Sequence, residues 1–239
     1  ATEQYAAFSA DDDFLISDSL SKCAKFLENN LDFRTAQGKA ALFTLKESGP
    51  FGTMDNVGSY WSKKEAEEKT GIERILHFGE NYWVPQFSVH RTDELCEDLK
   101  NYSTMPDRAF GELIYCFLCI CHGRSKFLDC LYLIRQVHGA RYTMPDTFDW
   151  VSSLDWYPSF RIFTDTLVSA LSKVDGIGED EASEIVKQAN KNGTPTIEGY
   201  MNIKSAKDIL SKYGSAKIIT ANNVFAHADN LDEMLKSIK

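Results

Sequence analysis

Four of the six cysteines lie in one apolar segment: Cys116, Cys119, Cys121 and Cys130, with His122 directly after the third. Thiolates and imidazoles are ligands that zinc prefers, so the cluster raises the question of a metal site. Zinc-binding cysteines usually sit on turns, whereas the residues around these four are typical of a protein core. Free cysteine behaves as a small apolar side chain. We therefore expect reduced, buried, metal-free thiols and assign no metal ligand.

A nucleophilic cysteine is the second chemistry that these residue types allow. A catalytic thiol needs a neighbouring base, and His90, His122 and His138 are the candidates. The sequence alone does not bring any of them together with a thiol. The acids at 11–13 offer oxygen ligands for a cation, but acids are equally typical of a helix N-terminus. We assign no catalytic residue and no cofactor, and we expect a protein that is not an enzyme.

A basic strip between positions 108 and 141 is the clearest regional charge signal. Its members are Arg108, Arg124, Lys126, Arg135 and Arg141, and Tyr132 lies among them. Basic side chains beside aromatic rings suit single-stranded nucleic acid, because the first neutralise phosphates and the second stack on nucleobases. The alternative is that long basic side chains surround an apolar core and keep their charges in water. In either case, we expect replacement of Arg124 and Arg135 by Glu to leave stability nearly unchanged.

The segment 174–185 has two glycines around one isoleucine, between two helical patterns. It resembles a helix-hairpin-helix motif. The matching positions are Val174, Gly176, Ile177, Gly178, Ala182 and Ile185. The resemblance implies that backbone N–H groups around Gly176 and Gly178 hold a DNA phosphate without reading its sequence. Three acids follow at 179–181, where that family commonly has basic or neutral residues. The alternative is therefore a capped helical hairpin without a ligand, since acids stabilise the start of a helix.

The net charge of −9 disfavours a protein that coats nucleic acid or anionic membranes. A nucleic-acid partner would have to contact a local basic strip. No run approaches the ~20 apolar residues of a membrane span, and the first residues lack the basic and apolar regions of a signal peptide. We expect a cytoplasmic, intracellular protein without a membrane partner. A mature secreted chain is the alternative.

The spacing of apolar residues predicts helices as the elements that position these groups. The predicted helices cover 9–30, 34–47, 62–69, 73–78, 92–102, 104–122, 124–137, 159–173, 179–190, 205–213 and 230–238. Two of them, divided by Gly123, are expected to form a buried helical hairpin over 105–139. One short strand is predicted at 216–223, without a partner. The expected fold class is mainly α, a multi-helix bundle with aromatic-rich loops and little or no β structure.

Aromatic-rich loops interrupt this helical pattern. The loop at 143–158 predicts a boundary between two helical units, 1–145 and 146–239, and one continuous domain is the alternative. Tryptophan and tyrosine are favoured anchors of protein interfaces. The candidate interface residues are Tyr82, Trp83, Trp150 and Trp156.

Three hypotheses about function follow from these patterns. The first is a structural, packaging or accessory protein that binds the backbone phosphates of nucleic acid without sequence specificity. The second is a self-assembling or adaptor protein that acts through protein–protein contacts. The third is a helical enzyme of unknown reaction, which we rank last.

Overall fold

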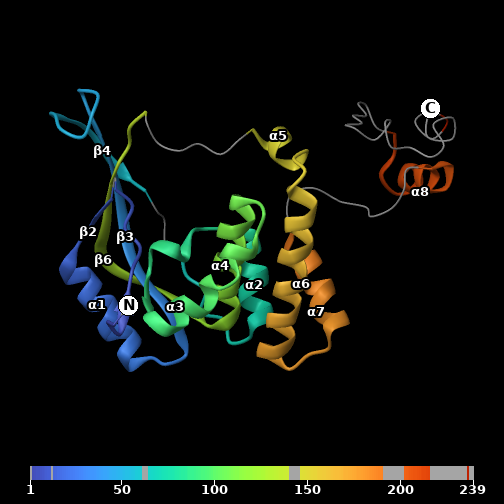
Figure 1. Cartoon of the computed structure of the whole chain (residues 1–239), viewed down its shortest axis with the longest axis horizontal. Helices are drawn as coiled ribbons and strands as arrows, with labels where there is room; N and C mark the ends of the chain where they lie inside the picture. Colours follow the sequence, from blue (N-terminus) through green and yellow to red (C-terminus); the bar gives the residue numbers. More distant parts are fainter. Residues whose placement is uncertain are drawn as a thin grey trace. The chain divides into compact units, whose positions relative to one another are not determined.

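The computed structural model of the chain describes residues 2–11, 13–60, 64–139, 146–190, 202–215 and 236. The chain divides into two compact units, Ala1–Asn192 and Gly193–Lys239. The described part of the second unit is one helix, α8 (Ile203–Tyr213). All other elements belong to the first unit (Figure 1). The boundary expected near residue 146 stays a prediction.

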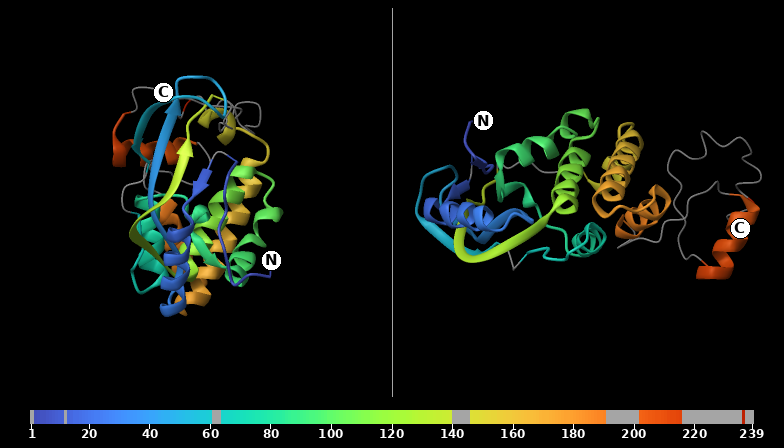
Figure 2. Two further views of the ribbon diagram at one scale, coloured as in Figure 1. Left: turned by 90° about the vertical axis from the view of Figure 1, so that its left-hand side faces the viewer. Right: turned by 90° about the horizontal axis from the view of Figure 1, so that it is seen from below.

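A six-stranded mixed sheet dominates one side of the first unit as far as the chain is described. Its strands are β1 (Tyr5–Ala6), β2 (Asp13–Leu15), β3 (Phe33–Leu45), β4 (Met54–Ser59), β5 (Val89–Arg91) and β6 (Arg124–Gln136). Their order is β1-β5-β3-β6-β2, and β4 pairs with β3. The two long strands β3 and β6 run parallel, side by side (Figure 2). The expectation of a mainly α fold with little or no β structure is therefore wrong, and the fold is α/β.

Two of the predicted helices are the two longest strands. Residues 34–47 lie mostly in β3, and residues 124–137 lie mostly in β6, so the helical hairpin predicted over 105–139 is wrong in its second half. Much of β3 is buried on both faces, which removes the alternation that marks a half-buried strand. The β3–β6 register also shifts at three places, and such bulges disturb a two-residue period. An apolar run of this kind cannot be told from a helix by periodicity.

The helices of the first unit are mostly those that the sequence predicts. They are α1 (Ser17–Asn29), α2 (Gly71–Glu80), α3 (Thr92–Leu99), α4 (Arg108–His122), α5 (Thr147–Val151), α6 (Trp156–Asp175) and α7 (Glu179–Asn190). Two short 3₁₀ turns, η1 (Pro85–Phe87) and η2 (Tyr102–Thr104), join them. None of the described helices has the length and apolar character needed to cross a membrane.

The predicted helix at 62–69 is wrong where the chain is described. Residues 64–69 are not helical, and Ala66 instead forms an isolated bridge with Ser125 of β6. A capping box at Thr70 and Glu73 opens α2 after this segment. Ser62 itself lies outside the described residues, as do the strand predicted at 216–223 and most of the helix predicted at 230–238.

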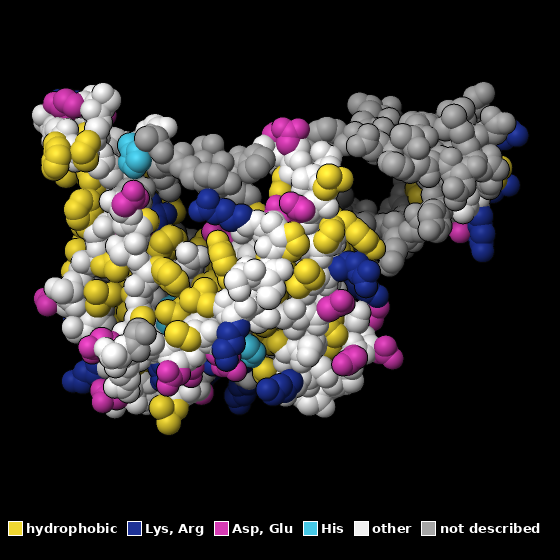
Figure 3. All heavy atoms as spheres, in the orientation of Figure 1, with side chains coloured by type: hydrophobic (Ala, Val, Ile, Leu, Met, Phe, Trp, Pro, Cys, Tyr) yellow, Lys and Arg dark blue, Asp and Glu magenta, His cyan; other side chains and the backbone are white. Residues whose placement is uncertain are grey.

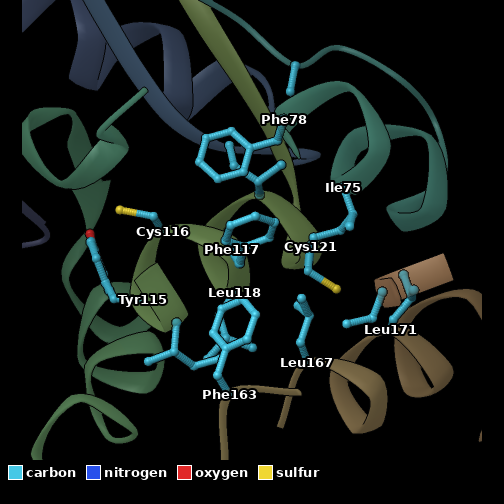
Figure 4. Packing of buried hydrophobic residues seen from close by; sticks show 14 of the residues in the cluster. Ile75, Phe78, Tyr115, Cys116, Phe117, Leu118, Cys121, Phe163, Leu167 and Leu171 are labelled. Atoms are coloured by element: carbon cyan, nitrogen blue, oxygen red, sulfur yellow. The ribbon is translucent and has the colours of Figure 1, made fainter. Parts of the chain in front are cut away.

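Two apolar cores hold the first unit together. The larger lies among α2, α4, α6 and α7, where Phe78, Phe117 and Phe163 meet edge to face (Figure 4). The smaller lies between α1 and the sheet, and includes Leu27 and Leu133. Three of the clustered cysteines, at 116, 119 and 121, lie on α4 and are fully buried, so their predicted place in the core is confirmed.

Candidate functional site

The basic strip is engaged by acids of the same chain. The Arg124 guanidinium donates to a carboxylate oxygen of Asp32 at 2.6 Å and to the carbonyl of Glu67 at 2.7 Å. It also lies over the Phe33 ring, 4.7 Å from the ring centre. The hydrogen bond from Arg124 lowers the pKa of Asp32. The charge of Arg124 is thus already opposed within the fold.

Lys126 and Arg135 follow the same pattern. Lys126 donates to the carboxylate of Glu67, and this hydrogen bond lowers the pKa of Glu67. Arg135 is 5 % exposed and its guanidinium forms a two-pronged ion pair with the fully buried Asp13 side chain. Substitution of Arg135 therefore cannot leave stability unchanged, contrary to the expectation from sequence, because it would break a buried pair. Arg141 lies outside the described residues.

The aromatic residue of the strip is also internal. Tyr132 is fully buried, and its hydroxyl donates to the carbonyl of Phe87 at 2.6 Å. A ring in this position is not presented to a nucleobase. The nucleic-acid interface predicted for Tyr132 and the neighbouring basic side chains therefore stays a prediction to which their geometry adds no support.

The glycine turn that resembles a helix-hairpin-helix joins α6 to α7. Gly176 has a left-handed backbone, with φ +67°, and the Ile177 N–H donates to the Ser172 carbonyl at 3.2 Å. Asp175 of the same turn accepts hydrogen bonds from the first two N–H groups of α2, Gly71 and Ile72, at 2.8 and 2.7 Å. The turn is therefore bound to α2, as a structural hairpin requires. Phosphate binding at Gly176 and Gly178 stays a prediction.

The predicted aromatic interface residues differ in exposure: Trp83 is buried, Trp150 and Trp156 are partly buried, and Tyr82 is exposed. Trp83 is 5 % exposed and packs edge to face on Phe78, and Trp150 and Trp156 pack on Phe110. Tyr82 is 40 % exposed. The exposed apolar side chains in the loop at 143–158 are instead Val151, Leu154 and Tyr157. Trp83 thus belongs to the core, and Trp150 and Trp156 pack against it while remaining partly exposed.

Several apolar side chains lie together on one face of the sheet, in the region where β3 pairs with β4. Val57 of β4 lies opposite Phe43 of β3, and the Phe43 ring lies 6.2 Å from that of Phe14 in β2. Phe14 in turn lies opposite Ile134 of β6. Phe14 and Val57 are each 57 % exposed. These four residues, together with Leu131 of β6, are called the sheet patch below.

A groove continues the sheet patch along the sheet. It has a volume of about 620 Å³ and is lined by Lys39, Ala40, Ala41, Gly58, Ser59, Phe127, Asp129 and Leu131. Lys39 and Asp129 form an exposed ion pair across β3 and β6. Figure 3 shows hydrophobic side chains over the side of the molecule where Figure 1 places β2, β3 and β4. The patch is therefore apolar, with a small charged border.

The strand beside the patch has an open edge. β3 is the only described strand that pairs with β4, and all six residues of β4 are exposed. Proteins usually protect such edges with lysine, proline or a covering element. β4 contains one charged residue, Asp55, and neither lysine nor proline. An edge of this kind can accept a further strand from another chain.

Sequence reasoning missed this surface because it assigned β3 to a helix. A signal was present: two segments with apolar residues flank a loop rich in glycine and proline, Gly49 to Gly52, which is typical of a β-hairpin. A hairpin at this loop would have predicted that Leu45 and Met54 face each other at the ends of two paired strands.

Two of the three histidines considered as catalytic bases, His90 and His122, contact oxygen atoms. His90 is fully buried, and its Nε2 lies 3.1 Å from both the Tyr115 hydroxyl and the Pro85 carbonyl. Burial lowers its pKa to about 4, so it is neutral at pH 7. Nδ1 of His122 lies 2.7 Å from the buried carboxylate of Asp98, which also accepts from Arg34. This network links β3, α3 and α4, and it is an ion-pair cluster of the fold.

Among the described residues, no group of three or more His, Cys, Asp or Glu side chains is placed to hold a metal ion. The sheet patch with the open edge of β4 is therefore the strongest candidate site. Comparison with known proteins adds no assignment: the chain matches no protein-family model and has no significant match among curated proteins.

Proposed function

We propose that this protein is not an enzyme and acts through protein–protein contacts, associating with further copies of itself through the sheet patch and the open edge of β4. The observation that carries the proposal is the position of exposed apolar side chains on one sheet face directly beside β4, whose outer edge pairs with no strand in the part of the chain that the structure describes. An uncovered apolar patch of this kind is typical of an interaction site.

The energy available from the patch favours reversible association. Full burial of a Val, Leu, Ile or Phe side chain contributes about 1.5–3 kcal/mol, and the patch members are already partly covered. A two-fold contact would bury the same patch on both copies. The total free energy gained by burying the patch on both copies is comparable with the roughly 4–15 kcal/mol that association costs. We therefore expect an equilibrium that depends on protein concentration.

Salt separates this proposal from nucleic-acid binding. Each copy carries a net charge of −9, so two copies repel one another at low ionic strength. Salt screens that repulsion and does not weaken apolar contact, so self-association should strengthen with salt. Binding to nucleic-acid phosphates should instead weaken steeply as salt rises, because the release of counterions from the nucleic acid becomes less favourable.

Sedimentation velocity over a range of protein concentrations, at low and high salt, tests the proposal. We expect Val57→Lys to shift the protein towards the monomer, because a charge would enter the contact. Leu31→Lys is the matched control, since Leu31 is 81 % exposed in the turn after α1 and away from the patch. A parent protein that stays monomeric at every concentration, or a Val57 variant that associates like the parent, would contradict the proposal.

The hypothesis of nucleic-acid binding keeps one possible place in the fold, the α6–α7 turn. The turn is exposed at Gly176 and Gly178, and exposed acids follow at 179–181. If it holds a phosphate, Glu179→Lys should strengthen binding of single-stranded DNA in a filter-binding titration. Unchanged binding would leave the turn a structural hairpin.

A further inference from the structure

Two thiols from different elements meet between α1 and the sheet. Cys23 lies in the middle of α1 and is fully buried, whereas Cys130 of β6 is partly exposed. Lys22 and Phe26, on either side of Cys23 in α1, line the same hollow as Cys130, so the two cysteines are neighbours across the contact between α1 and β6. Both are free thiols, and no shared role for them follows from the proposed self-association. The pair is therefore a separate feature of the molecule.

The backbone on both sides holds these thiols in place. The hydroxyl of Ser19, one helical turn before Cys23, donates to the carbonyl of Leu131 at 2.6 Å. This bond ties α1 to β6 one residue after Cys130. On the far side, a Cβ atom added to Gly38 of β3 would lie 2.9 Å from the Cys130 sulfur. The sulfur of Cys130 therefore lies against β3, beside the point at which α1 is bound to β6.

Solvent can reach the pair from one side. A cavity of about 480 Å³ is lined by Lys22, Lys25, Phe26, Asn29, Asn30, Leu128, Asp129 and Cys130. Lys22 and Phe26 flank Cys23 on α1, but Cys23 itself is fully buried, so the cavity opens onto Cys130. A small oxidant can therefore contact Cys130 without unfolding of the helix.

We infer that Cys23 and Cys130 form a reversible intramolecular disulfide when the protein meets a peroxide. The Cys130 thiolate attacks one peroxide oxygen, the O–O bond breaks, and Cys130 becomes a sulfenic acid while hydroxide leaves and takes up a proton as water. The Cys23 sulfur then attacks the sulfenic sulfur. The S–S bond forms, the S–O bond breaks, and the leaving hydroxyl departs as water with the proton of Cys23. Two thiols thus supply the two electrons that reduce one peroxide.

The environments of the two thiols set this order. Burial, with smaller contributions from the charge and the hydrogen bond of Cys130, raises the pKa of Cys23 to about 12. Cys23 therefore stays a protonated thiol at neutral pH and reacts slowly with peroxide by itself. Cys130 lines the cavity and is oxidised first, and Cys23 resolves its sulfenic acid.

Peptide mapping of the folded full-length chain tests the inference. The reduced protein is treated with hydrogen peroxide, its remaining thiols are blocked under denaturing conditions, and the peptides are identified by mass spectrometry. We expect a Cys23–Cys130 linkage, a loss of two of the six free thiols, and full reversal by dithiothreitol. The melting temperature should rise by several degrees on oxidation, because the bond closes a long loop of the unfolded chain.

Cys130→Ser should abolish the linkage, and Cys96→Ser is the matched control because Cys96 is exposed on α3 and remote in sequence from the pair. The control variant should form the bond as the parent does. Mapping of the parent protein decides the question even if the Cys130 variant folds poorly. Oxidation that ends in intermolecular disulfides through Cys96, or in sulfinic acid at Cys130 with no Cys23–Cys130 peptide, would overturn the inference.

Discussion

The basic and the apolar side chains of one strand, β6, lie in contrasting environments. Its basic residues, Arg124, Lys126 and Arg135, find acids of the same chain at Asp32, Glu67 and Asp13. Its apolar residues Leu131 and Ile134 lie instead on a sheet face that no described helix covers. A count of charges along the sequence therefore overstates the net positive charge of the strip, because the acids that pair with Arg124, Lys126 and Arg135 come from distant segments.

The ion pair between Asp13 and Arg135 gives the largest expected effect on this comparison. Asp13→Ala would leave the Arg135 charge buried without its partner, so we expect a loss of about 3–5 kcal/mol in the free energy of unfolding. Urea denaturation measures it. Asp129→Ala is the matched control, because that carboxylate is 86 % exposed and solvent screens its pair with Lys39, so little stability should be lost. Equal losses in the two variants would show that Arg135 is not held as a buried charge.

Neighbouring leucines on β6 test which face of the sheet is covered. Leu133 is fully buried against α1, so Leu133→Ala should cost about 2–5 kcal/mol of stability through a lost contact and a cavity. Leu131→Ala, at a side chain that is 45 % exposed, should cost well under half as much while weakening self-association. Chemical denaturation and sedimentation of both variants provide the two measurements. A Leu131 variant as unstable as the Leu133 variant would mean that the patch is covered.

Acid should destabilise the interior through His90. Its pKa is about 4 when folded, against about 6.5 in the unfolded chain, so the unfolded state binds a proton first as pH falls. The contribution is fully present above about pH 6.5 and is lost as pH falls to about 4, with a size of up to about 3 kcal/mol. Urea denaturation at pH 7 and pH 4.5 should show a smaller loss for His90→Gln than for the parent. If the parent and the His90→Gln variant lost the same stability, a group other than His90 would be responsible for the effect of acid.

The glycine turn gives the smallest expected effect. Gly176→Val should cost about 1–3 kcal/mol, because Gly176 has a left-handed backbone that a β-branched residue tolerates poorly. Gly178→Ala is the control: a Cβ there meets no neighbouring atom, and its backbone is not left-handed. Thermal unfolding of both variants makes the comparison. If Gly178→Ala were the more damaging change, the turn would be strained in a way that its backbone angles do not reveal.

The helices were largely predictable from sequence because their signals are local. Thr92 opens α3 as predicted, and α4 and α7 match their apolar periods. The sheet was not predictable in this way, because its two long strands are parallel and largely buried, and their partners lie far away in sequence. The same reason hid the sheet patch, which exists only when β2, β3, β4 and β6 are assembled. The ion-pair partners of the basic strip are likewise set by tertiary structure.

The parallel pairing of β3 and β6 has a consequence for the order in which the chain can fold. β4, α2, β5, α3 and α4 all lie between these two strands in sequence, so the central pair of the sheet closes only after that whole stretch is available. Contacts between such distant segments slow folding, because the entropy of closing a long loop is lost before the contacts form. During synthesis, β3 therefore cannot pair with β6 until residue 136 has emerged from the ribosome. Throughout that interval, the apolar edge of β3 is accessible to chaperones.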